Sequence, residues 1–207
     1  MLSKEEICNV AHAYFSKTTK EIVELEILLI RSDVQIALPF IVAATINSIH
    51  YKSSVRDVLK EIYHKPGIIE EAINYTMAER DIGHTIDHAF RICKRLGDDV
   101  ENIFVQLLKY SEIEVRLVSG LLLLKYEKLT PSTIKMIRAL VDTLPTNSAT
   151  GPLFYLCVLL LYKNGDNQTD QWVKREAMLR KTDIDDYLRV IHVNILYLLL
   201  IGDLQHG

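Results

Sequence analysis

Turn and helix-stop signals divide this chain into segments of helix length. Within the segments, apolar residues recur at three- and four-residue spacing, and the strict alternation of a strand is hard to find. Gly and Pro provide most of the breaks, because Pro cannot continue a helix and Gly suits turns. The chain is therefore predicted to be all-α. The breaks fall at Lys65-Pro66-Gly67, Gly97-Asp98, Thr130-Pro131-Ser132, Leu144-Pro145, Gly151-Pro152 and Asn164-Gly165-Asp166-Asn167.

About a dozen helices are predicted between these breaks. Ser3 and Glu6 form a plausible capping box for the first helix. Pro39 either kinks the third helix or marks its first turn. The predicted ranges are 4–15, 18–30, 34–49, 55–63, 68–79, 82–96, 99–109, 112–126, 131–143, 151–162, 170–180 and 184–201.

The predicted helices recur as pairs joined by a short polar turn. The turns are Arg31-Ser32-Asp33, Glu79-Arg80-Asp81, Tyr110-Ser111-Glu112, Thr146-Asn147-Ser148 and Lys181-Thr182-Asp183. Their centres are separated by 49, 30, 36 and 35 residues, and the first interval has room for the extra short helix 55–63. The other intervals lie near the period of paired-helix solenoids.

The clearest pair spans residues 101–125. Ile103, Val105, Leu107 and Leu108 precede its turn, and Val115-Arg116, Ser119-Gly120 and Leu121 follow it. This pattern resembles the HEAT-repeat family, in which the turn leads to a Val-Arg pair and then to small residues where the second helix packs closely. The other pairs match in length and apolar pattern but lack the Val-Arg pair. The resemblance implies a right-handed α-α superhelix, HEAT/armadillo-like, of about five helical hairpins.

Length and composition favour one continuous helical domain over residues 1–207, with residues 1–65 as an atypical N-terminal cap. Hydrophobic residues make up 49% of the chain and charged residues 25%, which is ordinary for a globular domain. A two-domain helical bundle and a tetratricopeptide-like stack remain open, although the aromatic and glycine spacing of the latter is not in register.

Charge, cysteine usage and apolar run length predict a cytoplasmic protein. The net charge is −3, and Cys8, Cys93 and Cys157 are odd in number and lack metal spacing, as expected for reduced thiols. The N-terminus enters an amphipathic pattern directly, without the features of a signal peptide. The longest apolar runs, 153–162 and 195–201, are about half the roughly 20 residues that span a bilayer. No membrane association is predicted.

The segment from His84 to His88 is the one cluster that suggests chemistry, because histidines four apart share a helix face and could share a metal. A zinc protease needs Glu after the first His, where this chain has Thr85. Residues 83–97 also resemble the opening helix of HD-type phosphohydrolases, but the His-Asp pair of that family occurs nowhere in the chain. A metal-dependent hydrolase using His84 and His88 is therefore the less favoured alternative, and no cofactor or metal is predicted.

Two basic clusters support a nucleic-acid alternative: Arg91-Lys94-Arg95 and Lys174-Arg175-Arg180-Lys181, the second beside Trp172. Cations and an aromatic ring could contact phosphates and stack on a base. DNA glycosylases built from HEAT-like repeats use a curved basic face of this kind. The chain is net acidic, however, and its clusters are spaced as on a solvated helix face.

The last predicted helix, 184–201, is apolar nearly all round. A terminal solenoid repeat needs a polar outer face, so this helix is expected to be wrapped by neighbouring helices. The alternative is an interface, either with a partner or in a homodimer.

The favoured function is protein–protein recognition, without catalysis, by the inner helices of the solenoid. This class includes adaptors, regulators and immunity or inhibitor proteins. The expected inner helices are 34–49, 82–96, 112–126, 151–162 and 184–201. Their polar residues are the candidate partner-binding residues, and Arg116 is also expected to pair with Glu112. The candidates are His84, His88, Arg91, Arg95, Arg116, Arg189 and His192.

Overall fold

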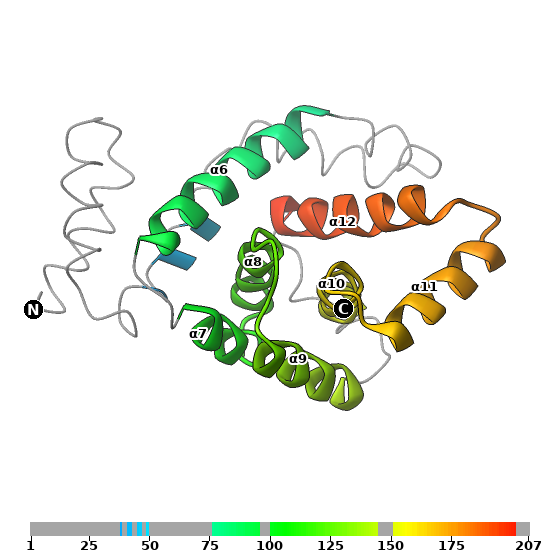
Figure 1. Cartoon of the computed structure of the whole chain (residues 1–207). Helices are drawn as coiled ribbons and strands as arrows, with labels where there is room; N and C mark the ends of the chain where they lie inside the picture. The colour runs from blue at the N-terminus through cyan, green and yellow to red at the C-terminus, as the bar shows by residue number, and fades with distance from the viewer. Residues whose placement is uncertain are drawn as a thin grey trace, which may run out of the picture.

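A computed structural model describes residues 76–95, 100–144 and 151–201, together with positions 38, 41, 42, 45, 46 and 49. These ranges are all-α: they contain seven complete helices and no strand (Figure 1). The proposed cap, 1–65, lies outside the described residues apart from the six positions, as do the predicted turns at 31–33 and 146–148. The helices are α6 (Thr76–Lys94), α7 (Val100–Leu107), α8 (Ile113–Leu124), α9 (Pro131–Thr143), α10 (Gly151–Lys163), α11 (Asn167–Leu179) and α12 (Ile184–Ile201).

The six isolated positions fall in the predicted helix 34–49, and all six are helical. Leu38, Ile41, Val42 and Ile49 are buried in the same core as the seven helices. Their spacing places them on one helix face. The effect of Pro39 lies outside the described residues.

The sequence placed most helix ends within a few residues of where they lie. The ranges 131–143 and 184–201 coincide with α9 and α12. The predicted turn at Glu79-Arg80-Asp81 is wrong, because α6 runs through it without a break. Glu and Arg are good helix formers, and no Gly or Pro interrupts the segment. The predicted intervals of 49 and 30 residues both used this turn as an end point, so neither is a repeat spacing.

Local signals explain why α9 and α11 begin where they do. Thr130 caps α9 by accepting a hydrogen bond from Thr133 N at 3.3 Å, and Pro131 occupies the first turn, where it needs no donor. Asp166 caps α11 by accepting from Thr169 N at 2.8 Å. The turn after α11 contains Lys181 at a φ of 55°, consistent with the predicted turn at 181–183.

Helices α8 and α10 lie in the middle of the described part, and the other five helices surround them (Figure 1). Consecutive helices form the pairs α7–α8, α9–α10 and α11–α12. The second helices of these pairs pack in a row with α6, which we group with them from here on: α6 packs on α8, α8 on α10 and α10 on α12, and α12 returns to contact α6. Residues 117–123 of α8 and 156–161 of α10 are therefore buried throughout.

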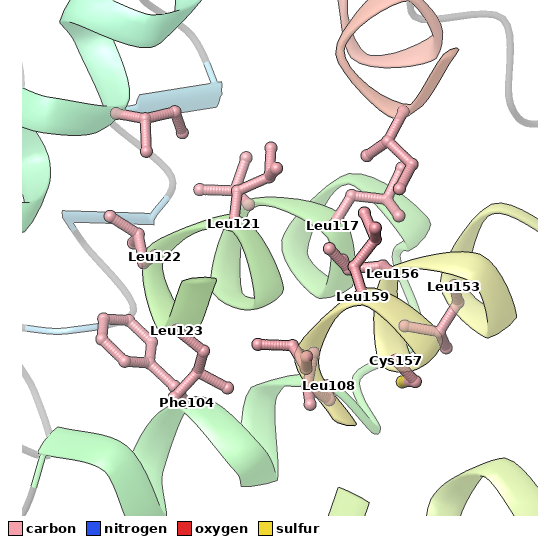
Figure 2. Close-up of a cluster of buried hydrophobic side chains, with 14 of the residues drawn as sticks. Phe104, Leu108, Leu117, Leu121, Leu122, Leu123, Leu153, Leu156, Cys157 and Leu159 are labelled. Atoms are coloured by element: carbon pink, nitrogen blue, oxygen red, sulfur yellow. The ribbon is translucent and has the colours of Figure 1, made fainter. Parts of the chain in front are cut away.

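Gly120 allows α8 and α10 to approach closely. A Cβ built at this position would lie 2.8 Å from Cγ of Leu156 and closer still to its Cδ2. Leu156 is fully buried among other core side chains, as Figure 2 shows, so it has little room to move. Ser119 is buried beside Gly120 and donates to Val115 O at 2.7 Å. The small pair Ser119-Gly120 thus lies where the second helix packs against its neighbour.

Side chains on the first helices join each pair to the next. Glu101 of α7 accepts hydrogen bonds from Thr130 N and Thr130 Oγ1, at 3.0 and 3.1 Å. Arg138 of α9 forms an ion pair with Asp166 and donates to Thr169 Oγ1 at 3.2 Å. A side chain of α7 thus binds the residue that caps α9, and a side chain of α9 binds the residue that caps α11. These contacts fix the spacing of successive pairs.

Helix α12 is wrapped by its neighbours along one face only, which corrects the expectation that they enclose it fully. Tyr187, Ile191, Ile195 and Leu199 are buried, at helical spacing. The opposite face exposes Asp186, Arg189, Val190 and Asn194, so α12 is amphipathic, not apolar all round. Among the described residues, no helix is long and apolar enough to cross a membrane.

Replacing Gly120 with Ala should lower the free energy of unfolding by about 1–3 kcal/mol, since the added methyl group overpacks a filled core. Chemical denaturation followed by circular dichroism would measure the change. The double variant Gly120→Ala/Leu156→Ala should lose less stability than the two single variants lose together, because the smaller side chain at position 156 removes the clash.

Gly83→Ala is the matched control, because Gly83 also lies inside a helix but its added Cβ meets nothing within 4 Å. It should leave stability unchanged or raise it by about 0.5–1 kcal/mol through better helix propensity. Equal effects at positions 83 and 120 would show that the α8–α10 contact does not require glycine.

Candidate functional site

A groove with a volume of about 670 Å³ opens between the four second helices. Its lining is mainly apolar, and each helix contributes to it. Helix α6 contributes Gly83 and Ile86, α8 contributes Leu121 and Leu124, α10 contributes Leu159 and Tyr162, and α12 contributes Leu188 and Leu196. Cavities of this size and character are typical of binding sites.

Cations lie around this apolar lining. Lys125, Lys163, Arg189 and His192 complete the described lining, which contains no Asp or Glu. Lys125 forms a 2.6 Å ion pair with Asp87, while the nearest contact of Arg189 with Asp186 is 3.9 Å. The groove lining therefore carries three cationic side chains, two of which also contact carboxylates outside the lining, in a chain whose net charge is −3.

Lys163 is held by neutral main-chain groups at the end of α8. Its Nζ donates to Leu124 O and, at 2.8 Å, to Tyr126 O. A cation suits this place, since the last carbonyls of a helix lack partners and carry partial negative charge. Burial, followed by repulsion from Lys125, lowers the pKa of Lys163 below its ordinary value. A carboxylate brought near it would stabilise the charged form.

The seven candidate residues from the sequence lie in three places. Arg189 and His192 line the groove. His84, His88 and Arg91 share a face of α6, and Arg95 directly follows this helix; all but His88 are exposed. Arg116 lines a separate cavity of about 490 Å³ beside Lys109, Leu140 and Leu153.

The expected pairing of Arg116 with Glu112 is replaced by contacts with the backbone of the turn. The guanidinium donates from Nε to Tyr110 O and from a terminal nitrogen, at 3.5 Å, to Ser111 O. These carbonyls lie between α7 and α8, so Arg116 fastens the turn of its own helix pair. The planar guanidinium has several N–H groups and can hold two carbonyl oxygens at once. A single ion pair at an exposed site contributes little to stability.

Sequence reasoning missed Gly83, Lys125 and Lys163. The two lysines directly follow or end the apolar helices α8 and α10, and a cation at a helix C-terminus is a readable signal. Their proximity to α6 and α12 is not readable, because it depends on how the second helices pack. Gly83 gave no signal, since a glycine within a helix is usually only a weak point in it.

The histidine pair of α6 has no further metal ligands nearby among the described residues. His84 is exposed and His88 partly buried, and Asp87 between them is engaged by Lys125. Within the described ranges, no three His, Cys, Asp or Glu side chains could jointly hold a metal ion.

Trp172 packs against the core and is not presented for base stacking. Its ring lies 5.6 Å from that of Phe154 and 6.5 Å from that of Tyr155. The neighbouring cations are also engaged: Lys174 pairs with Asp170 at 2.7 Å, and Arg180 lies 5.6 Å from the Tyr187 ring centre. These contacts favour a structural role for the cluster.

Cys93 and Cys157 are free and buried, and burial raises the pKa of each thiol to about 12. We expect both to resist alkylation in the folded protein, since roughly one thiol in ten thousand is ionised at about pH 8. Mass spectrometry after iodoacetamide treatment, with and without denaturant, would measure this. Rapid native labelling at either position would contradict the described burial.

The same shift gives a pH dependence of stability. The unfolded thiols titrate near 9.0 and the folded ones near 12, so the folded state retains protons that the unfolded state loses. Their contribution to stability is therefore complete below about pH 9 and falls as the pH rises toward 12.

Searches against protein-family models, curated proteins and solved structures found no match to this chain. The function proposed below therefore rests on the residues and geometry of the chain itself.

Proposed function

We propose that this protein is a non-catalytic recognition module that binds a partner protein in the groove between α6, α8, α10 and α12. In this proposal, α7–α8, α9–α10 and α11–α12 are successive hairpins of a HEAT-like, right-handed superhelical array. The second helices form the concave side of that array. An adaptor, a regulator and an immunity or inhibitor protein are all examples of the proposed class.

The observation that carries the proposal is the origin of the groove lining. All of its described residues come from the second helices or from Lys125, which directly follows α8. Those helices correspond to four of the inner helices expected from the sequence, 82–96, 112–126, 151–162 and 184–201. Because α12 also contacts α6, the row of second helices curves back on itself around the groove. Repeat arrays use such concave surfaces for binding.

The groove chemistry favours binding over bond-making. Its described lining offers leucines, cations, a tyrosine and a histidine, but no carboxylate, thiol or serine hydroxyl. An apolar centre with polar groups at its edge resembles the composition of protein interfaces. We also propose a cytosolic setting, which is supported by the two buried free thiols.

A homodimer through α12 is a second arrangement of the same class. Its support is the exposed strip of α12, where Val190 is 39% exposed beside Arg189 and Asn194. Static light scattering at several concentrations would give the mass. A dimer that Val190→Glu converts to monomer would support this arrangement, and a monomer throughout would exclude it.

Filling the groove should abolish partner binding without unfolding the protein. Gly83 lines the groove and has open space at its Cβ, so Gly83→Phe adds a large side chain there and removes a helix-weakening glycine. The probe is a phage library of random peptides about four helical turns long, selected on the wild-type protein. Selected peptides should bind Gly83→Phe at least about tenfold more weakly.

Gln171→Phe is the matched control, because Gln171 is exposed on α11 and lines neither cavity. It should bind the selected peptides like the wild type, and thermal unfolding should show both variants folded. Failure to select any peptide, or equal binding by wild type and Gly83→Phe, would overturn the groove as the recognition site.

A further inference from the structure

We infer that the groove receives an acidic amphipathic α-helix of the partner, with an apolar face on the groove lining and carboxylates toward Lys125, Lys163 and Arg189. This inference rests on the proposed function, since it specifies the chemistry of the segment that occupies the same groove. Three observations support it: the groove volume, the nature of its walls and its charge.

The volume suits a short stretch of helix. Two turns of helix, about 10 Å across and roughly 11 Å long, occupy about 860 Å³. The groove volume of about 670 Å³ would accommodate most of such a stretch while leaving one face in solvent. Two turns present apolar side chains at positions i, i+3, i+4 and i+7, which is the usual pattern of a helix held in a groove.

The walls favour a helix over an extended peptide. Within the described ranges the chain has no strand, so an extended segment would find no sheet edge to pair with. The apolar lining contributed by Ile86, Leu121, Leu159 and Leu188 could not satisfy the backbone groups of such a segment. An α-helix satisfies its backbone hydrogen bonds internally and can therefore enter an apolar groove at lower cost.

The charges select an acidic helix. The described lining contains three cations and no carboxylate. Of these cations, Lys163 donates to the carbonyl oxygens of Leu124 and Tyr126, and Arg189 lies 3.9 Å from Asp186 and is 62% exposed. A partner carboxylate would find both available. A basic helix would instead bring like charges together beside an apolar surface, which is unfavourable.

The test uses two synthetic peptides with fluorescein labels and identical leucine faces. One carries Glu and the other Lys at the positions flanking the face, and fluorescence anisotropy measures binding to the full-length protein. The Glu peptide should bind at least about tenfold more tightly at low salt. General attraction to a protein of net charge −3 would favour the Lys peptide, so a Glu preference must arise locally. The preference should shrink at about 1 M salt.

Arg189→Glu and Lys163→Gln test the source of the preference, with Lys135→Gln as the control. Lys135 is exposed on α9, outside the described groove lining. Either groove variant should reduce the Glu preference at least about threefold, and the control should not. Should Lys163→Gln fail to fold because its carbonyl contacts are lost, Arg189→Glu still decides the question, since that side chain is largely exposed.

Several outcomes would overturn the inference. They are equal or tighter binding of the Lys peptide, no binding of either peptide, and a Glu preference that persists in both groove variants. The library selection separates this failure from failure of the proposed function. Groove-dependent peptides that are neutral or basic would retain the recognition site and exclude the acidic helix, whereas absence of groove-dependent peptides would remove both.

Discussion

The close packing of α8 against α10 is the contact on which the rest of the described structure depends. These two helices contribute most of the fully buried leucines, and every other helix packs directly on at least one of them. Gly120 sets their separation, because a larger residue would collide with Leu156. A wider crossing would leave voids between the leucines of Figure 2 and would cost both apolar burial and dispersion energy.

The stretch between α8 and α9 is fixed from the end of α10. Lys163 donates to the carbonyls of Leu124 and Tyr126, and Asn164 Oδ1 accepts from Leu129 N at 2.8 Å. The polar end of one second helix thus holds the polar end of its neighbour. The same contacts bring Lys125 and Lys163 to the edge of the groove, so the cations that would meet a partner are already positioned by the fold. Such positioning lowers the entropy cost of binding.

The groove follows from the curvature of the row of second helices. Helices α6, α8, α10 and α12 pack on one another in a row, and α12 contacts α6, so the four helices surround a groove with a mainly apolar lining. Leu188 and Leu124 remain only partly buried there. Single apolar residues on a protein surface are common and do not indicate a binding site. Here the apolar residues line one concave surface, and cations lie at its edge. It is this combination that supports recognition of an acidic, amphipathic segment.

The sequence by itself determined the helical class and most helix boundaries in the described part. Local chemistry decides these features: Pro131 and Thr130 start α9, Asp166 caps α11, and apolar periodicity defines α12. The sequence also indicated close packing at Ser119-Gly120. It misplaced a turn at 79–81, because short polar runs with good helix formers continue a helix as readily as they end one.

Only the tertiary structure decided which polar residues share a site. Of the seven candidates, it brings Arg189 and His192 together at the groove, with Lys125, Lys163 and Gly83, which sequence reasoning had not selected. It directs Arg116 to a turn and arranges the α6 candidates along another face. The physical reason is that periodicity specifies the face of each helix, whereas the rotation and spacing of neighbouring helices depend on side-chain packing between residues far apart in the chain.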